Sequence, residues 1–100
     1  MPKRRSETTA EEAAALALQG LAFLAEDGPR LGRFLALPGI GPDRLRAVAD
    51  APDTLLAVFE HLMSDESLLL VFAASKGIPP ESLAPARAAL ARAFGVEGPA

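Results

Sequence analysis

The chain has 100 residues, which suits a single domain with one hydrophobic core, and its net charge of −3 argues against bulk attraction to nucleic acid. Half of the residues are hydrophobic, led by alanine and leucine with no tryptophan or tyrosine, and this composition favours helices over strands. The absence of cysteine excludes disulfides, thiolate nucleophiles and most structural zinc sites.

The first helix follows a polar start of the chain. Residues 1–8 are polar and charged, and they predict a disordered tail. Thr9 and Glu12 have the spacing of a capping box, which predicts a helix over about residues 10–26. Its apolar residues cover two adjoining faces, namely Leu16, Gly20, Phe23 and Leu24 on one and Leu18, Leu21, Ala22 and Ala25 on the other. Such a helix is either central in the core or covered by a partner.

The first 25 residues match a signal peptide only in part. A basic start precedes the apolar residues 13–25, but Glu7, Glu11 and Glu12 lie between the two and no small-residue cleavage pattern follows. The apolar run is also shorter than the roughly 20 residues that span a bilayer. We therefore expect a cytoplasmic protein that does not enter the membrane.

Prolines and glycines divide the middle of the chain. The sequence Asp27-Gly28-Pro29 predicts the end of the first helix, with Gly28 at positive φ, and the start of a second over about residues 29–37. Pro38 stops this second helix because it lacks an amide hydrogen and disfavours helix at the residue before it. After the Gly-Ile-Gly turn, further prolines predict a third helix over about residues 42–50 and a fourth over about residues 52–63.

The last third of the chain predicts two more helices. Ser64 is the expected cap of a fifth helix, with Asp65 and Glu66 at its positive end. Residues 68–72 are all apolar and could form a buried strand, but the following Lys-Gly pair favours a helix that ends at residue 76. A final helix runs to about residue 94, and Pro85 kinks it or resets its start.

These elements predict an all-α fold, a compact single-domain bundle of five or six short helices. The folded domain is expected to span residues 9–94, and residues 95–100 are expected to fray.

Two long segments carry a resemblance. The strings ALALQGLAFLAEDGPRLGRFLALPGIGPDRLRAVA and LLLVFAASKGIPPESLAPARAAL resemble a family of short uncharacterised helical proteins, found chiefly in alphaproteobacteria and catalogued as a domain of unknown function. The similarity covers about residues 13–90. It implies a bacterial, all-α, single-domain protein, and it implies no activity, ligand, partner or catalytic residue.

A second, local resemblance lies in residues 37–48. Leu-Pro-Gly-Ile-Gly-Pro is similar to the turn of a helix-hairpin-helix module, in which backbone amides and a helix N-terminus face a phosphate. Four arginines and one acid lie nearby, so the candidate nucleic-acid contacts are Gly39, Ile40, Gly41, Arg30, Arg33, Arg44 and Arg46. Leu45 stands where the module usually has a small residue, Asp43 puts a negative charge where a phosphate would lie, and no second copy follows. The alternative is a purely structural turn.

The remaining polar residues predict no catalytic site. His61 is the only histidine, and no matched carboxylate cluster or nucleophile lies near it, so we expect a surface residue on the fourth helix. The acidic pairs at residues 11–12 and 65–66 are helix-start charges. We therefore predict no catalytic, metal-binding or cofactor-binding residues, and no enzyme activity.

The strongest functional signal is surplus apolar surface. The first helix and residues 68–72 both look apolar on more than one face, and two such helices are hard to enclose in a domain of this size. The leading hypothesis is a small protein-interaction module, most simply a homodimer, with the candidate surface residues Leu18, Leu21, Leu69, Leu70 and Phe72. The alternatives are weak nucleic-acid binding through the Gly-Ile-Gly turn, or two helices that cover each other.

Overall fold

The computed structural model describes residues 8–37 and 40–95, and within them the chain forms six α-helices and one 3₁₀-helix with no strand. The elements are α1 (Ala10–Ala25), α2 (Gly28–Ala36), α3 (Pro42–Val48), α4 (Pro52–Met63), α5 (Glu66–Lys76), η1 (Pro80–Ser82) and α6 (Leu83–Phe94). The all-α prediction is confirmed. The strand considered for residues 68–72 is wrong, because this run lies inside α5.

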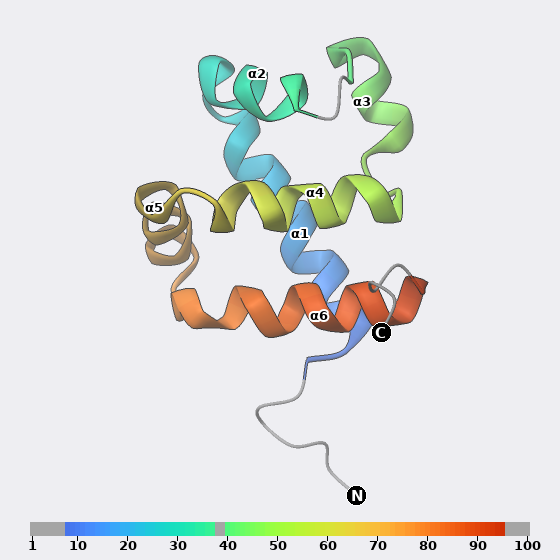
Figure 1. Ribbon diagram of the computed structural model, residues 1–100. Coiled ribbons are helices and arrows are strands. Elements are labelled where there is room, and N and C mark those ends of the chain that lie inside the picture. The colour runs from blue at the N-terminus through green and yellow to red at the C-terminus, as the bar shows by residue number, and fades with distance from the viewer. Residues whose placement is uncertain (1–7, 38–39, 96–100) are drawn as a thin grey trace, which may run out of the picture.

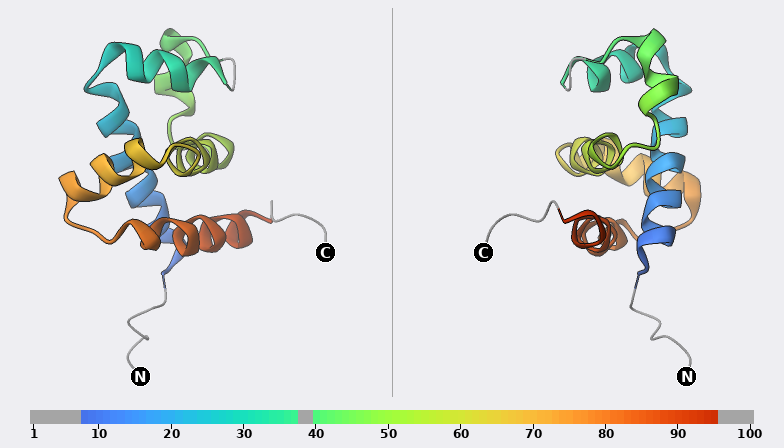
Figure 2. Two further views of the ribbon diagram at one scale, coloured as in Figure 1. Left: turned by 60° about the vertical axis from the view of Figure 1, so that its left-hand side comes forward. Right: turned by 90° about the vertical axis from the view of Figure 1, so that its right-hand side faces the viewer.

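Three helices make the centre of the bundle. α4 and α6 lie side by side, and α1 crosses both of them on one side (Figures 1 and 2). α2 and α3 lie together at one end, and α5 connects α4 to the 3₁₀ turn before α6 (Figure 1). Because α1 lies outside the α4–α6 layer, it has one face toward the core and one face away from it.

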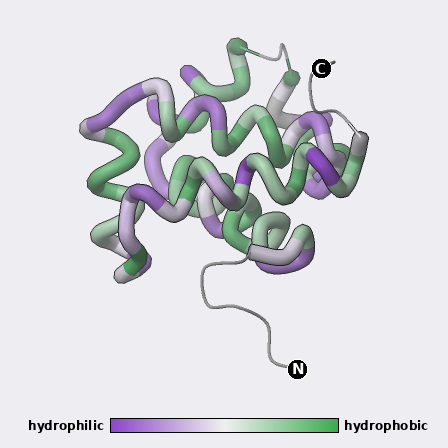
Figure 3. Tube along the Cα trace, turned by 60° about the horizontal axis from the view of Figure 1, so that its bottom comes forward, coloured by the Kyte–Doolittle hydropathy of each residue, from purple (hydrophilic) through white to green (hydrophobic). Residues whose placement is uncertain are grey.

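The core is a single cluster of aliphatic and aromatic side chains. Apolar and polar segments alternate along the helices (Figure 3), as expected for helices with one buried stripe. The largest fully buried side chains are Phe34, Phe59, Phe72, Leu24, Leu55, Leu62, Leu83, Leu90 and Val58. Each such side chain contributes about 1.5–3 kcal/mol through its removal from water, so this cluster is the main favourable term for folding.

The helix ends follow local side-chain chemistry, with one correction. At the start of α1 the predicted capping box is confirmed: the Glu12 amide donates to Thr9 Oγ1 at 3.0 Å, and the Thr9 amide donates to Glu12 Oε1 at 3.1 Å. At α5 the prediction of Ser64 as the cap is wrong. Asp65 Oδ1 accepts from the Leu68 amide at 3.2 Å, whereas the Ser64 hydroxyl donates back to the His61 carbonyl at 2.8 Å.

Glycine and proline have the predicted roles at some helix ends only. Gly77 ends α5 in the left-handed conformation at φ 69°, as predicted. Gly28 has no positive φ, because the chain enters α2 directly from an extended Asp27 and needs no left-handed residue there. Pro85 is the third residue of α6, where its missing amide interrupts no helical hydrogen bond, and the true start of the helix is therefore reset to Leu83.

The helices α1 and α4 approach each other closely at Gly20. A Cβ atom at this position would lie 2.9 Å from Leu62 Cδ1 and 3.0 Å from Val58 Cγ1, and both of these side chains are fully buried. The absence of a side chain at Gly20 therefore lets the two helices pack directly against each other.

Substitution Gly20→Ala is expected to lower the free energy of unfolding by about 1 kcal/mol. Overpacking a core costs about 1–3 kcal/mol, and the better helix propensity of alanine returns about 1 kcal/mol of it. Gly32→Ala is the matched control, because Gly32 also lies within a helix but has no atom within 4 Å of an added Cβ, so this substitution should raise stability. Urea denaturation of both variants measures the difference, and equal stabilisation by both would contradict the close approach at Gly20.

Candidate interaction surface

The structure separates the five residues predicted for an interaction surface. Leu18 on α1 is 41% exposed and Leu70 on α5 is 46% exposed, while Leu69 is half-buried. The prediction is wrong for Phe72, which belongs to the core, whereas Leu21 is buried but lines the groove described below. Leu21 lies on the inward side of α1, and the Phe72 ring packs against the Phe23 ring with a centroid distance of 5.3 Å.

The outward face of α1 carries a regular apolar stripe. Its members are Ala15, Leu18, Ala22 and Ala25, all exposed, and Glu11 continues the same line in the first turn. These apolar residues are spaced by three, four and three positions, so they lie above one another on one side of the helix. The core-facing residues Ala13, Ala17 and Leu24 lie on the other side.

A groove runs beside this stripe, between α1 and α3. It has a volume of about 340 Å³ and is lined by Leu18, Leu21, Ala22 and Ala25 from α1 and by Leu45, Arg46 and Ala49 from α3 and its end. Arg46 is the only charged residue of the lining. We call this groove, together with the exposed stripe of α1, the α1–α3 surface.

The open groove follows from the shortness of α3. A helix of seven residues is too short to be stable by itself, so α3 depends on its contacts with the rest of the domain. Those contacts come from Ile40, Leu45 and Ala49, which are half-buried against the core. The helix therefore covers only part of the apolar side of α1, and the other part stays exposed.

A second and smaller apolar patch lies on α5. Leu70 and Val71 are about half exposed there, with the small residues Ser67 and Ala74 one turn away on either side. α5 packs against α4 and the 3₁₀ turn through its opposite face. Neither Leu70 nor Val71 lines the α1–α3 groove.

The Gly-Ile-Gly turn leads into α3 through an extended Gly41, with no side-chain cap among the described residues. Gly39 lies outside the described residues. The Ile40 side chain packs against the core and its amide donates to the Leu35 carbonyl at 3.1 Å. Gly41 caps α3, and Asp43 Oδ1 lies so close that it would be 2.8 Å from a Cβ at Gly41. The Asp43 carboxylate therefore lies beside the start of α3, where its negative charge disfavours a phosphate.

The four arginines of the predicted patch have different surroundings. The Arg30 guanidinium lies 4.7 Å from the centroid of the Phe23 ring and 3.8 Å from the Asp27 carboxylate, so it is engaged within the domain. Arg33, Arg44 and Arg46 are exposed, and none of them has an ion pair within residues 8–37 and 40–95. The structure thus leaves three of the four predicted arginines available to a partner.

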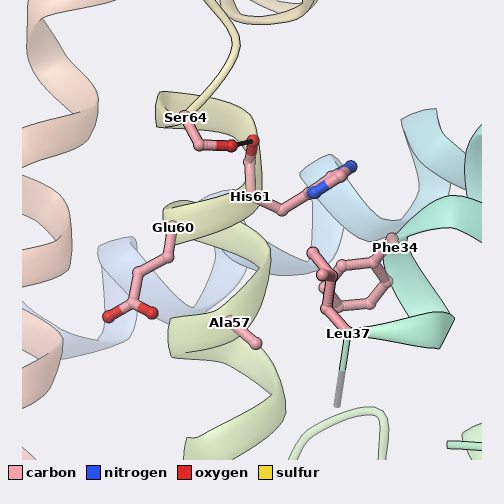
Figure 4. A pocket seen from close by; sticks show the side chains of 6 residues that line it. All are labelled: Phe34, Leu37, Ala57, Glu60, His61 and Ser64. Atoms are coloured by element: carbon pink, nitrogen blue, oxygen red, sulfur yellow. Dashed lines mark hydrogen bonds between the residues drawn. The ribbon is translucent and has the colours of Figure 1, made fainter. Parts of the chain in front are cut away.

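His61 is half-buried and is not the surface residue that the sequence predicted. Its imidazole points from α4 toward Phe34 and Leu37 (Figure 4), and the ring centroids of His61 and Phe34 are 5.4 Å apart. These side chains, with Ala57, Glu60 and Ser64, line a shallow hollow of about 320 Å³. No sequence signal indicated this hollow, because it depends on how α2 packs against α4.

The polar groups around the hollow are engaged elsewhere. The Glu60 carboxylate points away from His61 (Figure 4) and accepts from Arg87 Nη2 at 2.7 Å, which joins α4 to α6. The Ser64 hydroxyl donates to the His61 backbone carbonyl. Neither group forms a hydrogen bond with the His61 imidazole in this arrangement of the described residues.

The described residues also contain no group of three or more His, Cys, Asp or Glu side chains arranged to hold a metal ion. In the same part of the chain no helix combines the length and apolarity needed to cross a membrane.

A family model for proteins of unknown function, DUF3572, matches residues 10–93. The chain belongs to this family. The matched span begins at the first residue of α1 and ends in the last turn of α6, so the DUF3572 domain comprises the whole helical bundle. Comparisons with curated proteins and with solved structures found no match.

The His61 environment makes the stability of this DUF3572 domain depend on pH. Burial lowers the pKa of His61 below its ordinary value of 6.5; the nearby Asp65 carboxylate opposes this shift and Arg33 adds to it. His61 Nδ1 is also buried, and it has no hydrogen-bond partner among the residues that the structure describes. Because the pKa is lower in the folded state, the unfolded chain binds the proton first as the pH falls.

The contribution of His61 to stability is therefore expected to be complete above about pH 6.5 and to be lost as the pH falls from there through the lower folded-state pKa. Denaturation midpoints of the wild type and of His61→Gln, measured from about pH 8 to about pH 5, isolate this contribution from that of the carboxylates. The midpoint of the wild type should fall more than that of the variant. Parallel curves would contradict the assigned burial of the imidazole.

Proposed function

We propose that this DUF3572 domain is a small interaction module of the bacterial cytoplasm, without catalytic activity, which binds another protein through the α1–α3 surface. The observation that carries the proposal is the open apolar groove beside the exposed Leu18. An exposed apolar surface beside a groove is a typical protein-binding site.

The shape of the surface favours a helix as the bound element. The groove runs along α1, its lining is aliphatic, and Arg46 stands alone as a charge. An amphipathic helix that inserts residues spaced by three and four positions into an apolar groove is a common recognition mode. Leu18 is the anchor of this surface on the side of the domain, because it is the largest exposed apolar side chain of the stripe.

The α5 patch is the weaker candidate for the same function. Leu70 and Val71 have exposures similar to that of Leu18, but they do not line the α1–α3 groove and have small residues on either side. A partner gains more buried area in a groove, because more of its atoms contact the surface.

Site-specific photocrosslinking in the native host tests the proposal. A benzoylphenylalanine at Gln19, exposed beside Leu18 on α1, should yield a protein adduct that mass spectrometry identifies, and Leu18→Glu in the same chain should abolish it. The same probe at the exposed Ala84 on α6 is the control. Equal adduct yields at the two positions, or an adduct that survives Leu18→Glu, would contradict the α1–α3 surface as the binding site.

Nucleic-acid binding is a second candidate, supported by the exposed Arg33, Arg44 and Arg46 and by the helix-hairpin-helix resemblance of residues 37–48. Titration with duplex DNA at low salt, followed by amide NMR shifts over residues 40–46, separates the two functions. For an interaction module we expect no saturable shifts. Salt-sensitive shifts that disappear in Arg44→Glu would favour nucleic-acid binding instead.

A further inference from the structure

We infer that the partner of the α1–α3 surface is a second copy of this chain, bound so that the two α1 helices pair antiparallel about a two-fold axis at the level of residue 20. This inference rests on the proposed function and names its partner. It is argued from the spacing of the stripe, from the sizes of its side chains and from the charges at its ends.

The stripe is self-complementary about that axis. An antiparallel pair centred at residue 20 brings together positions whose numbers sum to 40. Leu18 then lies opposite Ala22 of the second copy, and Ala15 lies opposite Ala25 of the second copy, each pair occurring twice. The one large side chain of the stripe is thus matched to a small one across the axis.

The spacing and the groove fit the same arrangement. Intervals of three and four residues favour helices that cross at a shallow angle of about 20°, so contact extends along the helix. Ala22 and Ala25 line the groove, so Leu18 of the second copy, which lies opposite Ala22, can enter it. A parallel pairing would set Leu18 against Leu18 and leave gaps between the alanines.

The charges at the ends of the stripe are also complementary. Arg46 lines the groove together with Ala22 and Ala25, and Glu11 continues the stripe in the first turn of α1. Both are exposed, and neither has an ion pair in the described part of the chain. The antiparallel arrangement carries Glu11 of the second copy past Ala25, toward Arg46, and the two-fold axis makes this pair twice.

Sedimentation equilibrium from low to high micromolar protein tests the partner. We expect a reversible monomer–dimer equilibrium in the wild type, which Leu18→Glu shifts to monomer by at least about 30-fold in Kd because the substitution acts twice at the axis. Leu70→Glu on α5 is the matched control, since Leu70 is equally exposed and lies outside the α1–α3 surface, and it should leave the dimer unchanged. A wild type that stays monomeric at the highest concentration, or a dimer lost only in Leu70→Glu, would overturn the inference.

A charge exchange tests the ends of the interface. Glu11→Arg and Arg46→Glu should each weaken the dimer by about threefold to tenfold, as expected for two solvent-exposed ion pairs. The double variant restores opposite charges and should return Kd to within about twofold of the wild type. If circular dichroism shows that both single variants are folded and the double variant still does not recover the wild-type Kd, this assignment of the ends is overturned.

Cysteine mixing tests the antiparallel register. The natural chain has no cysteine, so only introduced ones can react. In the inferred dimer Ala15 lies opposite Ala25 of the second copy, while the two Ala15 positions are about 15 Å apart along the helices, beyond the reach of a disulfide. Oxidation should therefore crosslink an equimolar mixture of Ala15→Cys and Ala25→Cys but neither variant alone. Crosslinking of either variant alone would show a parallel pair and overturn the register.

These outcomes can be told apart from a failure of the proposed function. A monomeric wild type that still gives a photoadduct at Gln19 with a different protein would overturn the self-pairing and leave the α1–α3 surface as a binding site. A monomer that gives no adduct in the host would contradict both.

Discussion

The close approach of α1 to α4 at Gly20 determines most of the remaining structure. Because Val58 and Leu62 pack directly against the backbone of α1 there, the rotation of α1 about its own axis is fixed. The helical period then decides which residues face the core and which face away. With Gly20 and Leu24 inward, Leu18 and Ala22 must point outward, so the exposed stripe is a geometric consequence of the packing inside the bundle.

The helices could be predicted from the sequence because their signals are local. The capping box at Thr9, the prolines at the helix starts and the left-handed Gly77 each act within one turn of the chain. The error at α5 occurs because two neighbouring residues can both act as the N-cap of this helix. Ser64 and Asp65 are both good N-cap residues. Asp65 caps α5 because the Ser64 hydroxyl is already bonded to the last turn of α4, and a pattern of residue types does not show that bond.

The surface residues were harder to predict, for a different physical reason. Periodicity identifies the apolar faces of a helix, but α1 has more than one, and only contacts with distant segments decide which face is covered. Leu21 and Leu18 are equivalent in the sequence, yet the first is buried and the second is exposed. The hollow at His61 has the same origin, because it needs Phe34 from α2 and His61 from α4 to meet across a long separation in sequence.

The geometry of α1 separates the residues that hold the fold from those that are free to bind. Gly20 and Leu18 are two positions apart, but they face nearly opposite sides of the helix, so a change in one acts on the packing with α4 and a change in the other acts on the groove. α3 connects the two sides, since Leu45 and Ala49 contact the core and also line the groove. A partner in the groove would cover these same side chains, and because it binds only where α3 is formed, its binding would stabilise a helix too short to be stable alone.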